Sequence, residues 1–262
     1  MELYISLFVL GLFGGFISGL LGIGGGIIMV PLLLYVPPAV GAGLLGMKTI
    51  AGITSVQSFV GAVSGAIGHQ RFKRINMRLV MLMGGSMACG ALGGSIASSY
   101  ISEQTILVLF AGMALAAALL MFVPKTEQEH EPEAHSITFN QTLTGLVGFS
   151  LGVLSGLIGQ GGAFLFIPVM IYLLRIPTRI AIGSALAIGI LSSIAVLLGR
   201  IGTDQVPYLL ASIITVGVVI GAQFGSIVSQ KTPRTTLRYI LAVLISITAI
   251  KIWYEILFIG TN

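Results

Sequence analysis

The chain has 262 residues, of which 56% are hydrophobic and only 8% charged, with a mean hydropathy of +1.06 and a formal net charge of +5. A water-soluble domain of this length does not hide so much apolar surface, so we predict a protein surrounded by lipid. The positive charge does not indicate nucleic-acid binding, because the basic residues fall in short loops between apolar segments, where they orient a protein in the bilayer.

The sequence contains ten hydrophobic segments separated by short loops. In chain order they are 3–21, 23–36, 44–68, 79–100, 105–123, 139–158, 160–174, 178–199, 207–229 and 235–258. Eight of them are about 19 residues or longer, the length that crosses a ~30 Å hydrocarbon core as an α-helix. The segments 23–36 and 160–174 are too short for an untilted crossing. Short or broken helices at matching places in two halves of a membrane protein point to a substrate site.

The two halves of the chain carry the same glycine-rich motif. Residues 18–31 and 155–168 match at seven of fourteen positions, including the leading serine and the closing proline. A second block, 90–98, matches 221–229 at six of nine positions. A duplicated apolar unit broken by glycines is typical of membrane transporters that bind their substrate between two repeats.

The positions of the basic residues indicate how often each repeat crosses the membrane. Lys and Arg accumulate in short cytoplasmic loops, whereas Asp and Glu have little influence. With five crossings per repeat, ten of the thirteen basic residues share one face, and only Lys48, Arg200 and Lys251 lie on the other. With four crossings the split is seven to six, which orients nothing. Repeats with an odd number of crossings are inverted relative to each other. We therefore predict an all-α polytopic membrane protein of two inverted repeats, each with about five hydrophobic helices, giving eight full spans and two short, glycine-broken ones.

This topology divides the chain into three parts. We predict an N-terminal transmembrane repeat over 1–123, a hydrophilic linker over 124–138 and a C-terminal transmembrane repeat over 139–262. The charge distribution places the linker in the cytoplasm and both termini outside. The linker contains His130 and His135 among four glutamates, but a solvated spacer explains this composition better than a metal site. We predict no bound metal and no cofactor.

The glycine clusters are the candidate substrate site. In hydrocarbon an unpaired backbone amide costs several kcal/mol, so a Gly-x-Gly-Gly break is tolerated only where it lines a cavity or is buried in protein. A helix that begins after the break points its free N–H groups and its positive dipole end at the break, which favours an anion. Two such ends, brought together by inverted repeats, would form an anion cradle at the membrane midplane. The residues assigned to this cradle are Ser18, Gly22, Gly24, Gly25, Gly26, Ser155, Gly159, Gln160, Gly161 and Gly162.

Other glycines recur at every fourth position, a spacing that lets two membrane helices approach closely. We therefore assign helix packing, and no substrate contact, to three sets of small residues. They are the glycines 11, 15 and 19 with their counterparts 148, 152 and 156, the row 86, 90 and 94, and the row 217, 221 and 225.

Polar residues in the segment 44–68 are further candidates. If Lys48 faces the substrate, it supplies a fixed positive charge for an anion. Its position is equally compatible with a side chain that extends to the membrane interface. Thr49 and Gln57 follow it and join the candidate substrate-binding set. Gln57 faces either a cavity or a partner helix, because an unpaired amide in lipid is costly. His69 and Arg200 occupy matching positions just past the ends of their segments, and we interpret them as loop anchors, with a role as gates as the alternative.

None of the eight acidic residues lies in the middle of a segment. Cation pathways and proton or sodium coupling commonly rely on a buried carboxylate, so an anion pathway fits this chain better. An intramembrane serine or aspartyl protease would need a base beside its nucleophile or a pair of acids, and the segments offer neither. We therefore predict that the protein is not an enzyme.

The doubled motif is similar to one found in a known family. Ser-Gly-Leu-Leu-Gly-Ile-Gly-Gly-Gly and Ser-Gly-Leu-Ile-Gly-Gln-Gly-Gly, each followed by an apolar run that ends in Pro31 or Pro168, resemble the TauE/SafE sulfite exporter family, also called the toluene sulfonate uptake permease family. The resemblance covers essentially the whole chain. It implies a prokaryotic inner-membrane carrier for sulfur-containing anions such as sulfite, thiosulfate, sulfoacetate or other organosulfonates.

We therefore predict a secondary transporter that moves a small sulfur-containing anion across a bacterial or archaeal inner membrane by alternating access. An anion channel and a membrane subunit without transport activity of its own are the alternatives. The expected partners are the small anionic substrate and the lipid bilayer, and not nucleic acid. A homodimer formed through glycine-lined helix faces stays open.

Overall fold

The computed structural model describes residues 2–21, 26–68, 75–122, 139–160, 163–203, 205–232 and 234–259. Almost all of these residues are helical, and none of them lies in a β-strand. The predicted all-α architecture is therefore confirmed for the described part of the chain.

The helices follow one another in an order that matches the hydrophobic segments. Before residue 123 they are α1 (Glu2–Leu21), α2 (Gly26–Ala39), α3 (Met47–Gly68), α4 (Met77–Leu79), α5 (Gly85–Ala97) and α6 (Glu103–Phe122). A π-helical turn, Val80–Gly84, joins α4 to α5, and a 3-10 turn, Ser98–Tyr100, extends α5. After residue 138 they are α7 (Gln141–Ile158), α8 (Ala163–Tyr172), α9 (Thr178–Ile201), α10 (Tyr208–Lys231) and α11 (Arg234–Tyr254), which continues as a π-helical turn, Glu255–Ile259.

Six stretches of the described chain are long and apolar enough to cross a membrane by length and composition, namely Leu3–Leu20, Met77–Tyr100, Glu103–Leu120, Gln141–Ile158, Gly183–Ile201 and Tyr208–Ser229. The described part of the chain is thus all-helical, with six candidate membrane spans. The helices α3 and α11 are also long, with 22 and 21 residues, but are less apolar. The prediction of eight full spans therefore extends beyond these six and stays a prediction.

Apart from α4 and α5, which the π-helical turn joins into one long stretch, two described helices are short, and each follows one of the glycine motifs. α2 has 14 residues and α8 has 10, against 18 or more for the long helices α1, α3, α6, α7, α9, α10 and α11. Both contain the proline of the duplicated motif, Pro31 in α2 and Pro168 in α8. The expected shortness of these two elements is confirmed.

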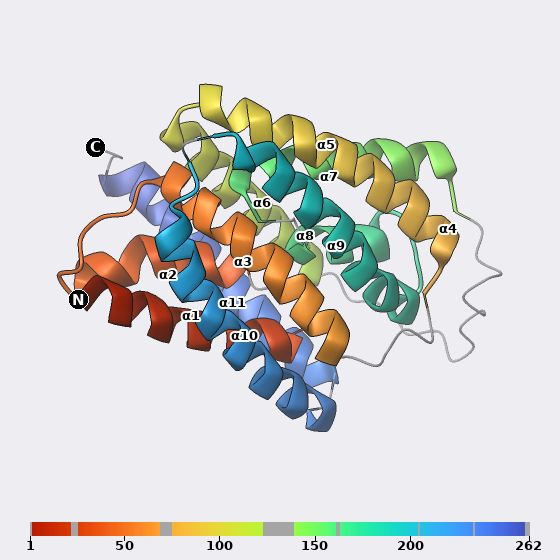
Figure 1. Ribbon diagram of the computed structural model, residues 1–262. Helices are drawn as coiled ribbons and strands as arrows, with labels where there is room; N and C mark the ends of the chain where they lie inside the picture. The colour runs from red at the N-terminus through yellow and green to blue at the C-terminus, as the bar shows by residue number, and fades with distance from the viewer. Residues whose placement is uncertain are drawn as a thin grey trace.

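Helices from before and after the 123–138 stretch are interlocked. α1 lies along α10, α5 lies along α7, α3 contacts α9, and α6 contacts α11. Figure 1 shows the first two of these pairs side by side, although each joins segments that are far apart in the sequence. The chain therefore buries its apolar surface mainly between its two halves.

Glycines explain why α1 and α10 approach so closely. A Cβ added at Gly11, Gly15 or Gly19 would overlap the backbone carbonyls of Ile214, Val218 and Ala222, and glycines 217, 221 and 225 lie in the same way against the α1 backbone. The pair α5 and α7 repeats the arrangement, with glycines 90 and 94 against α7 and glycines 152 and 156 against α5. The packing role predicted for these rows is confirmed. A homodimer would need a different surface, because these faces are used within the chain.

The order of these contacts gives the direction of each helix. Gly11 meets Ile214 and Gly19 meets Ala222, so α1 runs parallel to α10; glycines 152 and 156 meet residues 87 and 91, so α7 runs parallel to α5. The end of α5 and the start of α10 lie at one end of the bundle, where the Oγ of Ser98 donates to the Oε1 of Gln205 at 3.1 Å. In Figure 1, α1 begins at the left and α7 begins at the right. The two helices that carry the duplicated motif therefore run in opposite directions.

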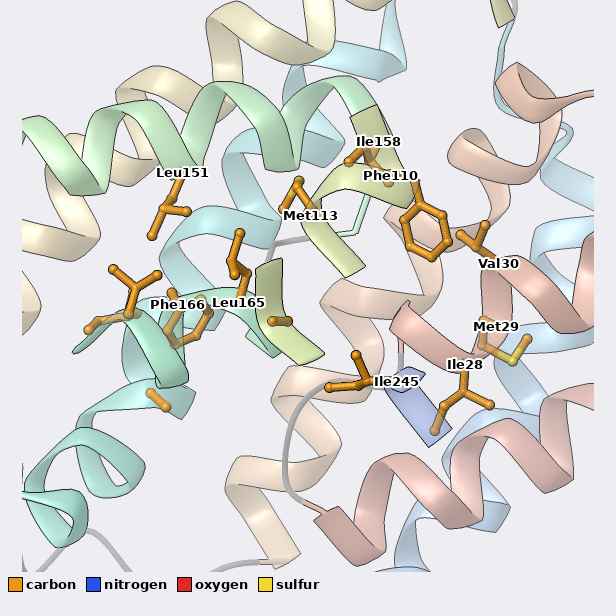
Figure 2. Packing of buried hydrophobic residues seen from close by; sticks show 14 of the residues in the cluster. Ile28, Met29, Val30, Phe110, Met113, Leu151, Ile158, Leu165, Phe166 and Ile245 are labelled. Carbon is orange, nitrogen blue, oxygen red and sulfur yellow. The ribbon is translucent and has the colours of Figure 1, made fainter. Parts of the chain in front are cut away.

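One apolar cluster surrounds the two short helices. Val30 of α2 and Phe166 of α8 are fully buried and belong to the same cluster as Phe110 of α6 and Ile158 of α7. Figure 2 shows these side chains converging between the helices, with Met113, Leu165 and Ile245 beside them. Side chains on the outside of the bundle are apolar as well, as in Leu209 and Phe224 of α10, which suits contact with lipid.

Candidate functional site

Helix α7 ends at the second glycine motif because Gly159 adopts a left-handed conformation, with φ of 82°. The backbone N–H groups of Gly159 and Gln160 both donate to the carbonyl oxygen of Ser155, at 2.9 and 3.2 Å. A side chain at residue 159 would also overlap the carbonyl of Ala51, in the first turns of α3. Glycine is required here both for the left-handed turn and for the close approach of α3.

Two buried side chains at this helix end carry polar atoms without partners. Ser155 is fully buried and Gln160 is 3% exposed. The Oγ of Ser155 and both amide atoms of Gln160 form no hydrogen bond with any residue that the structure describes. A buried amide normally finds partners, because leaving it unsatisfied costs about 1–3 kcal/mol. A hydroxyl and an amide held in this way can bind a polar ligand.

A positively charged side chain from α9 contacts the same turn of α7. Arg200 is near the end of α9 and is fully buried. Its Nη2 donates to the carbonyl oxygens of Gly156 and Leu157, both at 2.9 Å, and its Nη1 donates to the Oε1 of Gln205. Arg200 thus contacts the loop before α10 through Gln205, as the interpretation as a loop anchor requires, and its side chain is buried inside the helix bundle. Its proposed counterpart His69 lies outside the described residues.

Lys48 belongs to the edge of the same polar network. It is half-buried at the start of α3, and its Nζ donates to the carbonyl oxygen of Ser99 at 3.0 Å. The Oγ of Ser99 in turn accepts from the Nε2 of Gln205 at 3.1 Å. The backbone N–H of Met47 donates to a carboxylate oxygen of Glu103 at 2.7 Å, which caps α3 from another helix. Lys48 thus holds the end of the 3-10 turn after α5.

The other candidates on α3 are only partly brought together. Thr49 is half-buried and Gln57 is fully buried in the middle of the helix. α3 contacts α9, α7 and α1, so Gln57 lies inside the bundle and not against lipid. Its predicted position toward a cavity or a partner helix is therefore confirmed in that coarse sense.

The first copy of the motif is less completely described. Ser18 is 3% exposed near the end of α1, and Gly26 is the first residue of α2. The remaining cradle glycines lie outside the described residues, namely Gly22, Gly24, Gly25, Gly161 and Gly162. α1 packs on α10 and α7 packs on α5, and no described hydrogen bond joins Ser18 to Ser155. A single cradle formed by both motifs stays a prediction.

Arg200 and Gln205 also belong to this site, although the sequence did not predict them as members. Arg200 lies at the end of an apolar segment, where a basic residue usually reaches the membrane interface. Gln205 follows in a short loop. The signal that could have identified them is the combination of an arginine inside the last apolar turn with a nearby glutamine, since polar residues at membrane depth usually bind to one another.

Comparison with known proteins places the chain in context. Residues 7–252 match the family described as Sulfite exporter TauE/SafE. A probable membrane transporter protein of Xylella fastidiosa is 30% identical over 83% of this chain and 81% of its own length. The probable membrane transporter protein YdhB of Bacillus subtilis is 30% identical over 91% of this chain and 94% of its own length. MJ0441 of Methanocaldococcus jannaschii, also a probable membrane transporter protein, is 23% identical over 92% of each chain. No solved structure matches the chain.

Proposed function

The chain belongs to the sulfite exporter TauE/SafE family of membrane proteins, and from that premise we propose that it is a secondary transporter for a small sulfur-containing anion. Sulfite, thiosulfate, sulfoacetate and other organosulfonates are the substrate candidates. The observation that carries this proposal is the pair of buried side chains at the broken end of α7, Ser155 and Gln160, whose hydroxyl and amide atoms bond to no described residue. Both can donate hydrogen bonds to the oxygens of a sulfur oxyanion.

The helix that follows the break supplies further donors. α8 begins at Ala163, so its first N–H groups have no partner within the helix and its positive dipole end points back toward the break. α2 stands in the same relation to the first motif, beginning at Gly26. An anion between such helix ends receives backbone hydrogen bonds without a mobile side chain.

Alternating access requires two units that exchange positions around the substrate. The opposite directions of α1 and α7 support two inverted repeats, because these helices carry the two copies of the motif. The matched pairs α1 with α10 and α7 with α5 support the same arrangement. In each pair the first hydrophobic segment of one half packs on the fourth hydrophobic segment of the other. Rocking of these two pairs against the central pair α3 and α9 would open the site to one side and then to the other.

The membrane and orientation follow from the same proposal. The transporter lies in a bacterial or archaeal inner membrane, with the stretch 124–138 in the cytoplasm and both termini outside. The ten basic residues that share one face support this orientation. The end of the bundle that contains Lys48, Arg200 and Lys251 then faces outward.

The function is tested with the purified full-length protein in proteoliposomes. The panel contains labelled sulfite, thiosulfate, sulfate, sulfoacetate, taurine and chloride, each with and without a pH gradient. We expect saturable uptake and counterflow of at least one sulfur oxyanion. Single-channel currents without counterflow would support the channel alternative, and absence of flux for every anion would contradict the proposal.

A further inference from the structure

Arg200 is the largest fully buried side chain of the described structure, and its charge is not matched by an acid there. Its hydrogen bonds reach two backbone carbonyls and one amide oxygen, all of them uncharged. The Nε of the guanidinium forms no hydrogen bond with any described residue. A guanidinium stays protonated in proteins, so this site holds a full positive charge inside the bundle.

Two acids of the described chain are engaged elsewhere. Glu103 accepts from the backbone N–H of Met47, and Glu255 accepts from the hydroxyl of Tyr35 at 2.6 Å. Asp204 follows Arg200 closely in the sequence but lies outside the described residues, so the experiment below includes it. A buried charge without a counter-ion is costly. Charged residues inside membrane segments pair with one another or with backbone carbonyls, and they mark substrate and ion pathways.

The position of this charge corrects a feature that would otherwise repel an anion. The last carbonyls of α7 form the negative end of its helix dipole and point toward the break, where an anion is unfavourable. The Nη2 of Arg200 donates hydrogen bonds to the carbonyl oxygens of Gly156 and Leu157, which belong to the same turn as Ser155. The guanidinium therefore offsets the negative end of α7 close to the break, where the side chains of Ser155 and Gln160 have atoms that bond to no described residue.

Resting on the proposed function above, we propose that Arg200 is the fixed positive charge that makes the α7 site selective for anions. It neutralises the carbonyl end of α7 and offers its Nε hydrogen to one oxygen of a small oxyanion. Lys48 has a different task, since its ammonium is bound to the carbonyl of Ser99 at the edge of the network. Divalent oxyanions gain more from this charge than monovalent ones do.

The test compares Arg200→Gln and Arg200→Lys with Arg78→Gln, which removes a positive charge from an exposed side chain at α4. Initial rates of uptake into proteoliposomes give KM and maximal rate for thiosulfate, which is divalent, and methanesulfonate, which is monovalent. A lost charge-assisted hydrogen bond corresponds to a rise in KM of about tenfold or more, so we expect this for Arg200→Gln with thiosulfate. The rise should be smaller for methanesulfonate. Arg200→Lys should recover much of the thiosulfate KM, and Arg78→Gln should leave it unchanged.

The lysine variant distinguishes a role of the Arg200 charge in anion binding from a role in holding the end of α7. If Arg200 only holds the end of α7, lysine cannot reproduce the fork on two carbonyls, and Arg200→Lys will be as damaging as Arg200→Gln. That result, or an unchanged thiosulfate KM in Arg200→Gln, would overturn the proposal. Asp204→Asn tests the neighbouring acid. A tighter thiosulfate KM in that variant would mean that Asp204 already neutralises Arg200, and would also overturn it.

A binding measurement keeps the inference independent of flux. Thiosulfate and sulfite should raise the melting temperature of the detergent-solubilised wild type and of Arg78→Gln, but not that of Arg200→Gln. If the wild type transports no anion and is still stabilised by thiosulfate through Arg200, the transport proposal fails while the anion site stands. If no anion stabilises the wild type, the assignment of Arg200 fails as well.

Discussion

Gly94 of α5 lies directly against the backbone of Val153 of α7, so that even a methyl group at residue 94 would overlap the carbonyl oxygen of Val153. Its neighbour Gly93 faces open space, with no atom within 4 Å of the position of an added Cβ. Two adjacent glycines of one helix therefore have opposite tolerance to substitution. Only one of them sets the distance between the two helices.

The first prediction follows from this pair. Gly94→Ala should lower the free energy of unfolding by about 1–3 kcal/mol, because the added methyl group overpacks the contact with α7. Gly93→Ala should leave it unchanged or raise it by up to about 1 kcal/mol, because alanine favours the helix. Thermal unfolding of the two variants in the same detergent measures the difference. Equal melting temperatures would mean that α5 and α7 do not form the close contact described here.

The second prediction concerns the end of α7. Gly159→Ala should destabilise the protein by about 1–2 kcal/mol from its left-handed conformation alone, and the overlap with the Ala51 carbonyl adds to this cost. Transport should fall with it, because Ser155 and Gln160 depend on this turn for their positions. Gly202→Ala is the matched control, since residue 202 also ends a helix but has φ of −87° and open space around it. Normal uptake by Gly159→Ala would show that transport does not depend on this turn.

The third prediction concerns the charge of the site. Gln160→Glu places a carboxylate among buried groups that we expect to bind an anion, and like-charge repulsion should reduce thiosulfate uptake by about tenfold or more. Gln141→Glu adds the same charge at the exposed start of the same helix and should leave uptake unchanged. Initial rates of uptake into proteoliposomes measure both variants. Uptake by Gln160→Glu at the wild-type rate would remove Gln160 from the site.

The fourth prediction concerns orientation. In a chain whose Cys89 is replaced by serine, Glu131→Cys should react with a membrane-impermeant maleimide only in inside-out vesicles, because the positive charges place residues 124–138 in the cytoplasm. Thr261→Cys, near the C-terminus, should react only in intact cells, where the reagent reaches the outer face of the inner membrane. The extent of labelling is measured on the purified protein after each treatment. Reaction of both sites from the same side would exclude five crossings after the linker.

The elements that the sequence predicted best were those with a local signal. The short helices α2 and α8 were predicted from the glycine clusters and the lengths of the apolar runs. The rows of small residues predicted close helix packing. The sequence could not tell which row meets which. Gly19 contacts Ala222 and not a residue of its own half, because the choice of partner depends on the complete three-dimensional arrangement.

Side chains at the ends of apolar segments were the least predictable. Lys48 and Arg200 occupy similar places in the sequence, yet Lys48 is half-buried at a helix start and Arg200 is fully buried on two carbonyls. Their different depths depend on whether a neighbouring helix ends nearby. α7 stops at Gly159 and leaves carbonyls for Arg200. The residues around position 200 suggest a partner in Gln205, but they do not reveal that the end of α7 lies within reach of the guanidinium.

The interlocked helices also affect how the protein is made. α1 leaves the ribosome before the other described helices. α10, the helix it packs along, is complete only about 210 residues later, at Lys231. At roughly 5–20 residues per second, this interval lasts roughly 10 to 40 s. During that time the glycine face of α1 has only lipid, another nascent helix or an insertion factor to cover it. The assembly of this protein is therefore a late event, in which the second half completes the packing of the first.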